Sequence, residues 1–377
     1  MIESPGLPMT IVAFLLVLGP LVFLHELGHY AAGRWFGVKV DAFSVGFGRE
    51  VAGFTDRHGT RWKFGWLPLG GYVRFAGDMN PASQPDAEWL QLPAHERART
   101  FQAKPVWQRA IIVAAGPAVN LLLAVLILGG FAAAYGVDRT PATVGGVVQG
   151  SAADSAGLQP GDRIASLDRR SIETFSDLSF YTAMHPGERV TVEYLRDGAI
   201  RSTNAVIGSV VQRDRFGNEA KIGRFGIERG APVYAPLPIW EAPVEGTRMV
   251  GAILRGTVDG LWQIITGRRS VDEMGGPLRI AKTSGEQLSL GWPALVTFVA
   301  FVSINLGFIN LLPVPMLDGG HLFFYAIEAV KRGPVSPQTM EWAFRGGLAL
   351  LLALMIFVTV NDLGAFGVWR GLAGLIG

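Results

Sequence analysis

Two histidines and a glutamate lie close together near the end of an apolar run, in the stretch LVFLHELGHYAAG (21–33). On a helix, His25 and His29 would share one face, so both imidazoles could reach one metal ion. Glu26 would then lie beside the ion, where a carboxylate can act as a general base. The pattern predicts metal-assisted hydrolysis, with zinc as the metal that the H-E-x-x-H spacing favours.

A zinc site of this kind needs a third protein ligand, because catalytic sites hold three such ligands and a water. The chain has no cysteine, so the third ligand must be His, Asp or Glu. Asp318 is the best candidate, since it ends a long uncharged run and no other carboxylate lies so deep among apolar residues. His321 is the alternative, whereas His58, His95 and His185 lie in polar surroundings.

The composition indicates a membrane protein. The 377 residues are 49% hydrophobic and 17% charged, against about 25% charged for an ordinary globular protein. A spanning helix needs about 20 apolar residues, and the uncharged runs predict four of them, within 1–36, 110–137, 287–328 and 346–369. The formal net charge of +2 is too small to indicate a nucleic-acid partner.

The distribution of Lys and Arg predicts how the spans are oriented. Eleven of these residues lie between Arg34 and Arg109, and Lys331, Arg332 and Arg345 lie between the last two spans. Because cytoplasmic loops carry the excess of basic residues, both of these loops should be cytoplasmic. Both termini and the region from 138 to about 286 should then lie on the outer side of the membrane.

A soluble domain is predicted over 140–230. Turn signals alternate there with short strands, and Asp197-Gly198 is a strong hairpin signal. The stretch AGLQPGDRIASLD resembles the circularly permuted PDZ domains of bacteria. That resemblance implies capture of a peptide C-terminus by the loop GRFGI, with four residues in contact: Gly223, Phe225, Gly226 and Ile227. The alternative is a β-rich outer domain without a ligand.

Two further segments should associate with the membrane. Residues 37–109 contain Gly-rich, alternating stretches that predict β-strands, with Trp62 and Trp66 among them. These strands could form a membrane-associated hairpin or an ordinary cytoplasmic loop. Within 238–286, apolar residues recur at helical spacing up to Ile265, which predicts an amphipathic helix on the membrane surface, followed by a linker.

Together, HELGH in the first span, NLLPVPMLDGG in the third and the PDZ insert between spans two and three resemble the site-2 protease family of intramembrane zinc metalloproteases. The resemblance covers almost the whole chain and is closest to the single-PDZ branch of the bacterial regulator-of-sigma-E proteases. It implies one catalytic zinc ion, with His25, His29 and Asp318 as ligands and Glu26 as the catalytic base.

The resemblance also implies residues that contact the substrate. Asn310 opens the N-x-x-P-x-P-x-L-D-G pattern and would hold the substrate backbone. Asn120 occupies the family's G-x-x-x-N position, with a structural or substrate-positioning role. The membrane-associated hairpin, with Gly70 and Gly71, would offer a strand edge to which an unwound substrate helix can pair.

The expected fold is therefore a polytopic α-helical membrane protein with four transmembrane helices, a membrane-associated β-hairpin loop and an inserted extracytoplasmic α+β PDZ domain. The family implies single-span membrane substrates surrounded by membrane lipids, such as anti-sigma factors. A site-1 protease would cut these first, in the regulated intramembrane proteolysis of a stress response. Remnant signal peptides are a second substrate class. The alternative is a non-catalytic membrane receptor or metal carrier with a peptide-binding outer domain, which leaves Glu26 unexplained.

Overall fold

The computed structural model of the chain divides into two compact units, each described by itself below. One unit consists of Leu128–Thr266 and the other of Pro5–Ile127 with Gly267–Gly377. The residues that the structure describes are 5–77, 93–213, 219–268, 270–271 and 275–366.

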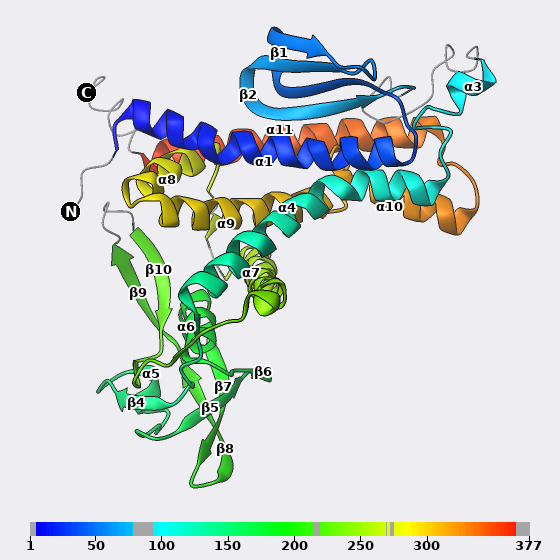
Figure 1. Ribbon diagram of the computed structural model, residues 1–377. Helices are drawn as coiled ribbons and strands as arrows, with labels where there is room; N and C mark the ends of the chain where they lie inside the picture. The colour runs from blue at the N-terminus through cyan, green and yellow to red at the C-terminus, as the bar shows by residue number, and fades with distance from the viewer. Residues whose placement is uncertain (1–4, 78–92, 214–218, 269, 272–274, 367–377) are drawn as a thin grey trace, which may run out of the picture. The chain divides into compact units, whose positions relative to one another are not determined.

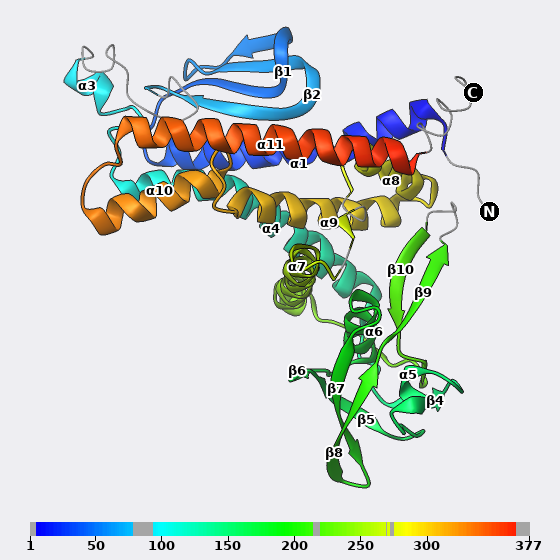
Figure 2. The same cartoon turned by 180° about the vertical axis from the view of Figure 1, so that it is seen from behind.

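Four of the described helices are long and apolar enough to cross a membrane. They are α1 (Leu7–Trp35), α4 (Val106–Tyr135), α9 (Trp292–Leu311) and α11 (Pro337–Ala365). Figures 1 and 2 show α1, α9 and α11 running along one another. Pro20 in α1 and Pro117 in α4 lie inside these helices, which membrane helices tolerate because neighbouring groups satisfy the freed carbonyls.

The ends of the last two long helices differ from the uncharged runs that predicted them. Pro293 lies in the first turn of α9 and does not interrupt it, since proline needs no hydrogen-bonded N–H there. Ser336 caps α11 by accepting a hydrogen bond from the N–H of Thr339, so that helix begins before residue 346. The end of the predicted fourth span, 367–369, lies outside the described residues.

The hairpin of β1 (Val40–Thr55) and β2 (Arg61–Phe75) folds back on itself. Residues 40–45 pair with 71–75 on one side and with 61–64 on the other, and 50–55 pairs with 61–65. The hairpin therefore forms a sheet of four segments, in which 71–75 is an outer edge. Figure 1 shows this sheet alongside α1, where Phe43 contacts the rings of Phe23 and Tyr30.

Three shorter helices complete this unit: α3 (Ala94–Arg97), α8 (Pro277–Ser289) and α10 (Asp318–Lys331). Helix α8 was not predicted, and most of it falls in the stretch expected to be a linker. Its first N–H groups are satisfied from α11, because the fully buried carboxylate of Asp362 accepts hydrogen bonds from the backbones of Gly276 and Arg279. A cap supplied by a distant segment leaves no local sequence signal.

The second unit is rich in short strands. They are β3 Val137–Asp138, β4 Val144–Val147, β5 Arg163–Leu167, β6 Arg170–Ser171, β7 Arg189–Arg196, β8 Ala199–Val206, β9 Gly208–Arg213, β10 Glu219–Arg224, β11 Ile227–Arg229 and β12 Tyr234–Ala235. Strands β5, β6, β7 and β8 form a sheet of order β6-β5-β7-β8, and β9 pairs with β10, β11 with β4 and β12 with β3. Asp197 and Gly198 form the turn between β7 and β8 with positive φ angles of 52° and 77°, as a tight hairpin requires. The helices of this unit are α5 Ala152–Ser155, α6 Phe175–Met184, the 3₁₀ helix η1 Ile239–Glu241 and α7 Ala242–Ile265.

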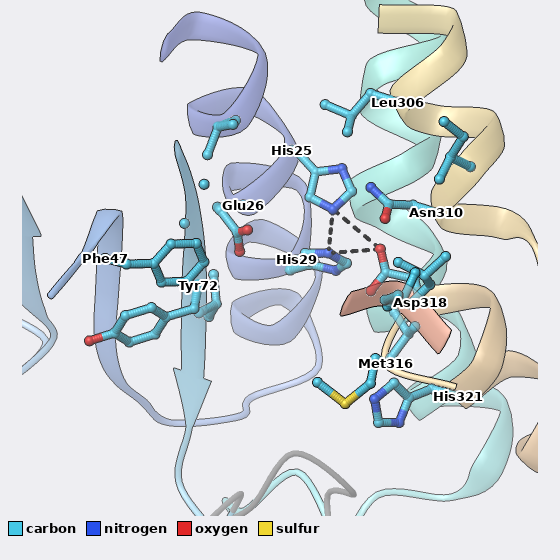
Figure 3. A pocket seen from close by; sticks show the side chains of 18 of the residues that line it. His25, Glu26, His29, Phe47, Tyr72, Leu306, Asn310, Met316, Asp318 and His321 are labelled. Atoms are coloured by element: carbon cyan, nitrogen blue, oxygen red, sulfur yellow. Dashed lines mark hydrogen bonds and ion pairs between the residues drawn. The ribbon is translucent and has the colours of Figure 1, made fainter. Parts of the chain in front are cut away.

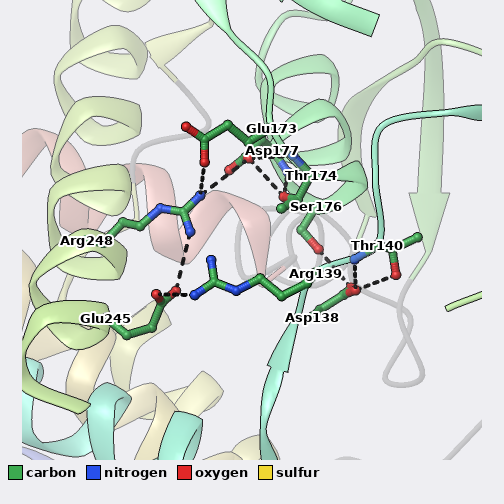
Figure 4. Close-up of polar contacts among 9 residues, drawn as sticks. All are labelled: Asp138, Arg139, Thr140, Glu173, Thr174, Ser176, Asp177, Glu245 and Arg248. Atoms are coloured by element: carbon green, nitrogen blue, oxygen red, sulfur yellow. Dashed lines mark hydrogen bonds and ion pairs between the residues drawn. The ribbon is translucent and has the colours of Figure 1, made fainter. Parts of the chain in front are cut away.

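Ion pairs fasten α7 to this β-rich domain (Figure 4). Arg248 of α7 lies 3.4 Å from Glu173 and 3.7 Å from Asp177 in the segment that opens α6. Glu245 of α7 lies 3.1 Å from Arg139, which precedes the domain. The apolar side chains of α7 that remain exposed are Val244, Val258, Trp262 and Ile265, so the helix has a polar attachment and a free apolar surface.

Candidate metal centre

Helix α1 carries the two histidines one turn apart on a buried face. His25 and His29 are 8% and 9% exposed, and their ring centroids lie 4.9 Å apart. Their Nε2 atoms are separated by 3.2 Å. Figure 3 shows both rings pointing toward the same space between α1 and the turn that precedes α10.

Asp318 reaches that space from the far end of the chain. Its Oδ2 lies 3.2 Å from His25 Nε2 and 3.5 Å from His29 Nε2. The turn that presents it is tight, because a Cβ at Gly319 would lie 2.2 Å from the carbonyl oxygen of Leu312. Met316 in the same turn has a φ of 81°, a conformation that side chains rarely adopt and that the surrounding turn must hold.

The three atoms have the spacing of metal ligands. His25, His29 and Asp318 form a cluster in which the ligand atoms all lie within 4.8 Å of one another. Zinc binds nitrogen and oxygen at about 2.0–2.1 Å in a tetrahedron, whose corners are then about 3.3 Å apart. The observed separations of 3.2, 3.2 and 3.5 Å match that edge, so the residues fit a zinc ion.

Helix α4 lies behind the two imidazoles. His29 Nδ1 donates a hydrogen bond of 2.9 Å to the backbone carbonyl of Ile112. The side-chain amide of Asn120 lies 3.1 Å from His25 Nδ1. Between them, Gly116 makes room for both rings, because a Cβ there would lie 2.3 Å from His29 Nε2 and 2.9 Å from His25 Nε2.

The side chain of Asn120 lies against His25 and away from the pocket beside the site. Its side chain is completely buried, and it is absent from the residues that line the pocket beside the site. Of the two roles predicted from the G-x-x-x-N pattern, the structure therefore favours the structural one. Gly116 and the Ile112 carbonyl were not among the predicted site residues, although the four-residue spacing of 112, 116 and 120 places them on one helix face.

Glu26 lies on the side of α1 that faces the β-sheet (Figure 3). Glu26 lines the pocket beside the site together with Val73, in the outer segment of β2. Gly71 allows this close approach, since a Cβ there would lie 2.9 Å from Glu26 Cγ. The sheet edge and the glutamate are therefore held together beside the ligand cluster.

A pocket of about 750 Å³ opens beside the cluster. Its lining includes Glu26 and three of the predicted substrate residues: Gly70, Gly71 and Asn310. His321 also lines the pocket, but it lies near Met316 and not among the three ligand atoms (Figure 3). Its Nδ1 atom is buried without a hydrogen-bond partner in the described part of the chain.

The predicted peptide-binding loop lines a separate pocket of about 280 Å³ in the β-rich unit. Gly223, Phe225, Gly226 and Ile227 contribute to it together with one side of α6. Gly226 has a φ of 83°, and a Cβ there would lie 2.1 Å from the Cβ of Ser151, so only glycine fits. The structure thus brings the four loop residues against α6.

Several known proteins are similar to this chain over nearly its whole length. Metalloprotease MmpA of Caulobacter vibrioides is 36% identical and matches 98% of this chain and 99% of its own. Two relatives carry provisional names as zinc metalloproteases. The one from Rhizobium meliloti is 45% identical, over 95% of this chain and 97% of its own length. The one from Agrobacterium fabrum is 42% identical, over 94% and 95%.

A solved PDZ domain, from the SdrC-like protein of Listeria monocytogenes, matches 25% of this chain and 90% of its own length at 18% identity. Its TM-score of 0.19 is too low to say anything about the fold. The family model of Peptidase family M50, in contrast, matches residues 13–354. The relatives, the four apolar helices and the zinc-ligand cluster agree with that match. The chain therefore belongs to peptidase family M50, the site-2 protease family, as a zinc metalloprotease of a membrane.

Proposed function

We propose that this protein hydrolyses peptide bonds within the membrane, in single-span membrane proteins, at one zinc ion held by His25, His29 and Asp318. The observation that carries the proposal is the location of the cluster. Two of its ligands lie in α1, one of the four helices that could cross a membrane. Ionisable groups at such a position are costly and are usually there for a function.

The residues beside the cluster suit peptide hydrolysis. A bound zinc ion would polarise the scissile carbonyl and make a water molecule more acidic. The Glu26 carboxylate would take the proton from that water and return it to the leaving amine nitrogen. Close packing against Gly71 of the sheet edge places Glu26 beside the pocket, so the base is positioned before substrate arrives.

The sheet edge offers a way to hold the substrate. A transmembrane helix must lose its internal hydrogen bonds before cleavage, and an extended segment can recover them along a strand edge. The outer segment 71–75 pairs on only one side within the described sheet. Gly71 of this segment and the preceding Gly70 line the pocket with Asn310, whose amide could bond the substrate backbone.

The basic residues support an inner-membrane orientation with cytoplasmic loops and periplasmic termini. In that orientation α1 enters from the periplasmic side at Leu7. His25 lies 18 residues further (25 − 7), which at 1.5 Å per residue is about 27 Å along the helix. Cleavage would then occur toward the cytoplasmic leaflet.

We further propose that residues 140–230 form a periplasmic PDZ domain that binds a peptide C-terminus. The pocket between α6 and the GRFGI loop supports this, as does β11, which pairs on one side with β4 and has no second partner among the described strands. A peptide could add there as a strand. The exposed apolar side chains of α7 suit the membrane surface, and its ion pairs would attach the domain to that surface (Figure 4).

The substrates that fit this arrangement are membrane proteins already shortened outside by a site-1 protease, such as anti-sigma factors in a stress response, and remnant signal peptides. Such substrates present a new C-terminus on the periplasmic side. The rival function, a receptor or metal carrier, requires no carboxylate beside the metal ligands and does not account for Glu26.

The decisive variant is Glu26→Gln, which removes the base and keeps the size of the side chain. We expect zinc content equal to wild type and the accumulation of uncleaved single-span proteins in the membrane proteome. The matched control is Glu50→Gln in the same unit, whose carboxylate pairs with Arg61 on the sheet and which should leave cleavage unchanged. Normal cleavage by the Glu26 variant would refute the mechanism.

A further inference from the structure

Helix α4 presents one face to the back of both histidines. Ile112, Gly116 and Asn120 follow one another at four-residue intervals, and each lies against an imidazole ring. We propose that this face sets the tautomer of both histidines, and that the side-chain oxygen of Asn120 accepts a hydrogen bond from His25 Nδ1–H. Asn120 is then a positioning residue of the metal site, an inference that rests on the proposed zinc ligation.

The tautomer of His29 follows from its partner. A backbone carbonyl can only accept a hydrogen bond, so His29 Nδ1 must carry the hydrogen in its 2.9 Å contact with Ile112. In the neutral ring the lone pair is then on Nε2. That atom faces His25 Nε2 and Asp318 Oδ2, as a metal ligand must.

The tautomer of His25 depends on which way the Asn120 amide points. The nitrogen and oxygen of an amide have nearly the same shape, so their assignment follows from the hydrogen bonds. With the nitrogen toward His25 Nδ1, the ring must accept there and carry its hydrogen on Nε2. This hydrogen would point into the ligand cluster and prevent metal binding, and the Asn120 oxygen has no hydrogen-bond partner in the described structure.

Reversing the amide resolves both conflicts. The oxygen then accepts from His25 Nδ1–H, and the Nε2 lone pair joins those of His29 and Asp318 at separations of 3.2–3.5 Å. Three lone pairs so close together repel one another unless a cation lies between them. A hydrogen bond of this kind to the distal nitrogen is the usual way in which proteins orient a metal-bound histidine.

Asn120 lies away from solvent and from the pocket. Its side chain is completely buried, and its backbone carbonyl accepts a 2.8 Å hydrogen bond from Ser303 of α9. Because it does not line the pocket, a change at Asn120 should act on the metal and not directly on substrate.

Zinc affinity separates the two orientations of the amide. We would measure it by chelator competition on the full-length protein in detergent, for wild type, Asn120→Asp and Asn120→Leu. A carboxylate can accept from Nδ1–H, whereas leucine of similar size cannot. We expect Asn120→Leu to lose about 10–100-fold in affinity, and Asn120→Asp to remain within a few fold of wild type.

The matched control is Ser303→Ala, which removes a buried hydrogen bond to the same residue's backbone and should keep wild-type affinity. If Asn120→Asp loses as much affinity as Asn120→Leu while the control does not, or if Asn120→Leu binds zinc like wild type, the inference is wrong. Asn120→Ala, scored in the same assay and by its unfolding midpoint without metal, replaces leucine should that variant not fold. Wild-type protein without zinc would instead contradict the proposed function.

Discussion

Gly116 offers the most direct perturbation of the metal centre from outside its ligands. A Cβ at this position would lie 2.3 Å from His29 Nε2, 2.6 Å from His29 Cε1 and 2.9 Å from His25 Nε2. Ordinary contact begins at 3.4 Å, so the His29 ring would have to retreat by about 1.1 Å (3.4 − 2.3). Metal–ligand distances tolerate only about 0.2 Å, so Gly116→Ala cannot keep the ligand geometry.

The expected effect of Gly116→Ala depends on which part of the structure moves. If the rings move, zinc affinity should fall by at least about 100-fold, since even the loss of a supporting hydrogen bond costs 10–100-fold. If α1 and α4 separate instead, the overpacked contact should destabilise the protein by about 1–3 kcal/mol. Zinc affinity by chelator competition and the unfolding midpoint of the metal-free protein together distinguish these routes.

Gly130→Ala is the matched control, because it makes the same change in α4 where no atom lies within 4 Å of the new Cβ. Alanine should stabilise the helix there by about 1 kcal/mol and leave zinc binding unchanged. Equal zinc affinity and equal stability of the two alanine variants would refute the close packing of α4 against the histidines.

Three further predictions test other parts of the structure. Gly71→Val should lower kcat by about 100-fold at unchanged zinc content, because its Cβ would lie 2.7 Å from the Ser44 carbonyl oxygen and 2.9 Å from Glu26 Cγ and would displace the base; a loss confined to KM would contradict this. Arg109 and Glu328 form a largely buried 2.7 Å ion pair, so Glu328→Ala should cost about 3 kcal/mol, seen as a lower unfolding midpoint that the double variant with Arg109→Met partly restores. Burial raises the pKa of the Asp162 carboxyl, but its hydrogen bonds, from Arg196 above all, outweigh this and hold the pKa below its usual range. Its contribution to stability is therefore complete above about pH 4 and lost at lower pH, and Asp162→Asn should flatten that part of a stability–pH profile.

The ligand cluster could be anticipated from the sequence because each part of it has its own signal within a short stretch of residues. The four-residue spacing of His25 and His29 determines that they share a helix face. Asp318 was the best candidate for the third ligand, since the chain lacks cysteine and Asp318 ends a long uncharged run, with His321 as the alternative. Long apolar runs likewise indicate spanning helices without any knowledge of their neighbours.

The supporting contacts could not be anticipated, because they depend on which surfaces meet. The G-x-x-x-N pattern contains Gly116 and Asn120, but nothing local says that their face of α4 meets the histidines and not the pocket. The fold-back of β1 and β2 requires two pairing registers for the same residues, which alternation alone does not specify. The role of Asp362 could not be predicted either, since a carboxylate in an apolar run does not indicate that it caps α8.

A zinc-edge anomalous map from crystals of the full-length protein tests the central claim most directly. We expect one peak, enclosed by His25 Nε2, His29 Nε2 and Asp318 Oδ2. A map without a peak between these atoms, or with zinc bound only elsewhere in the chain, would contradict it.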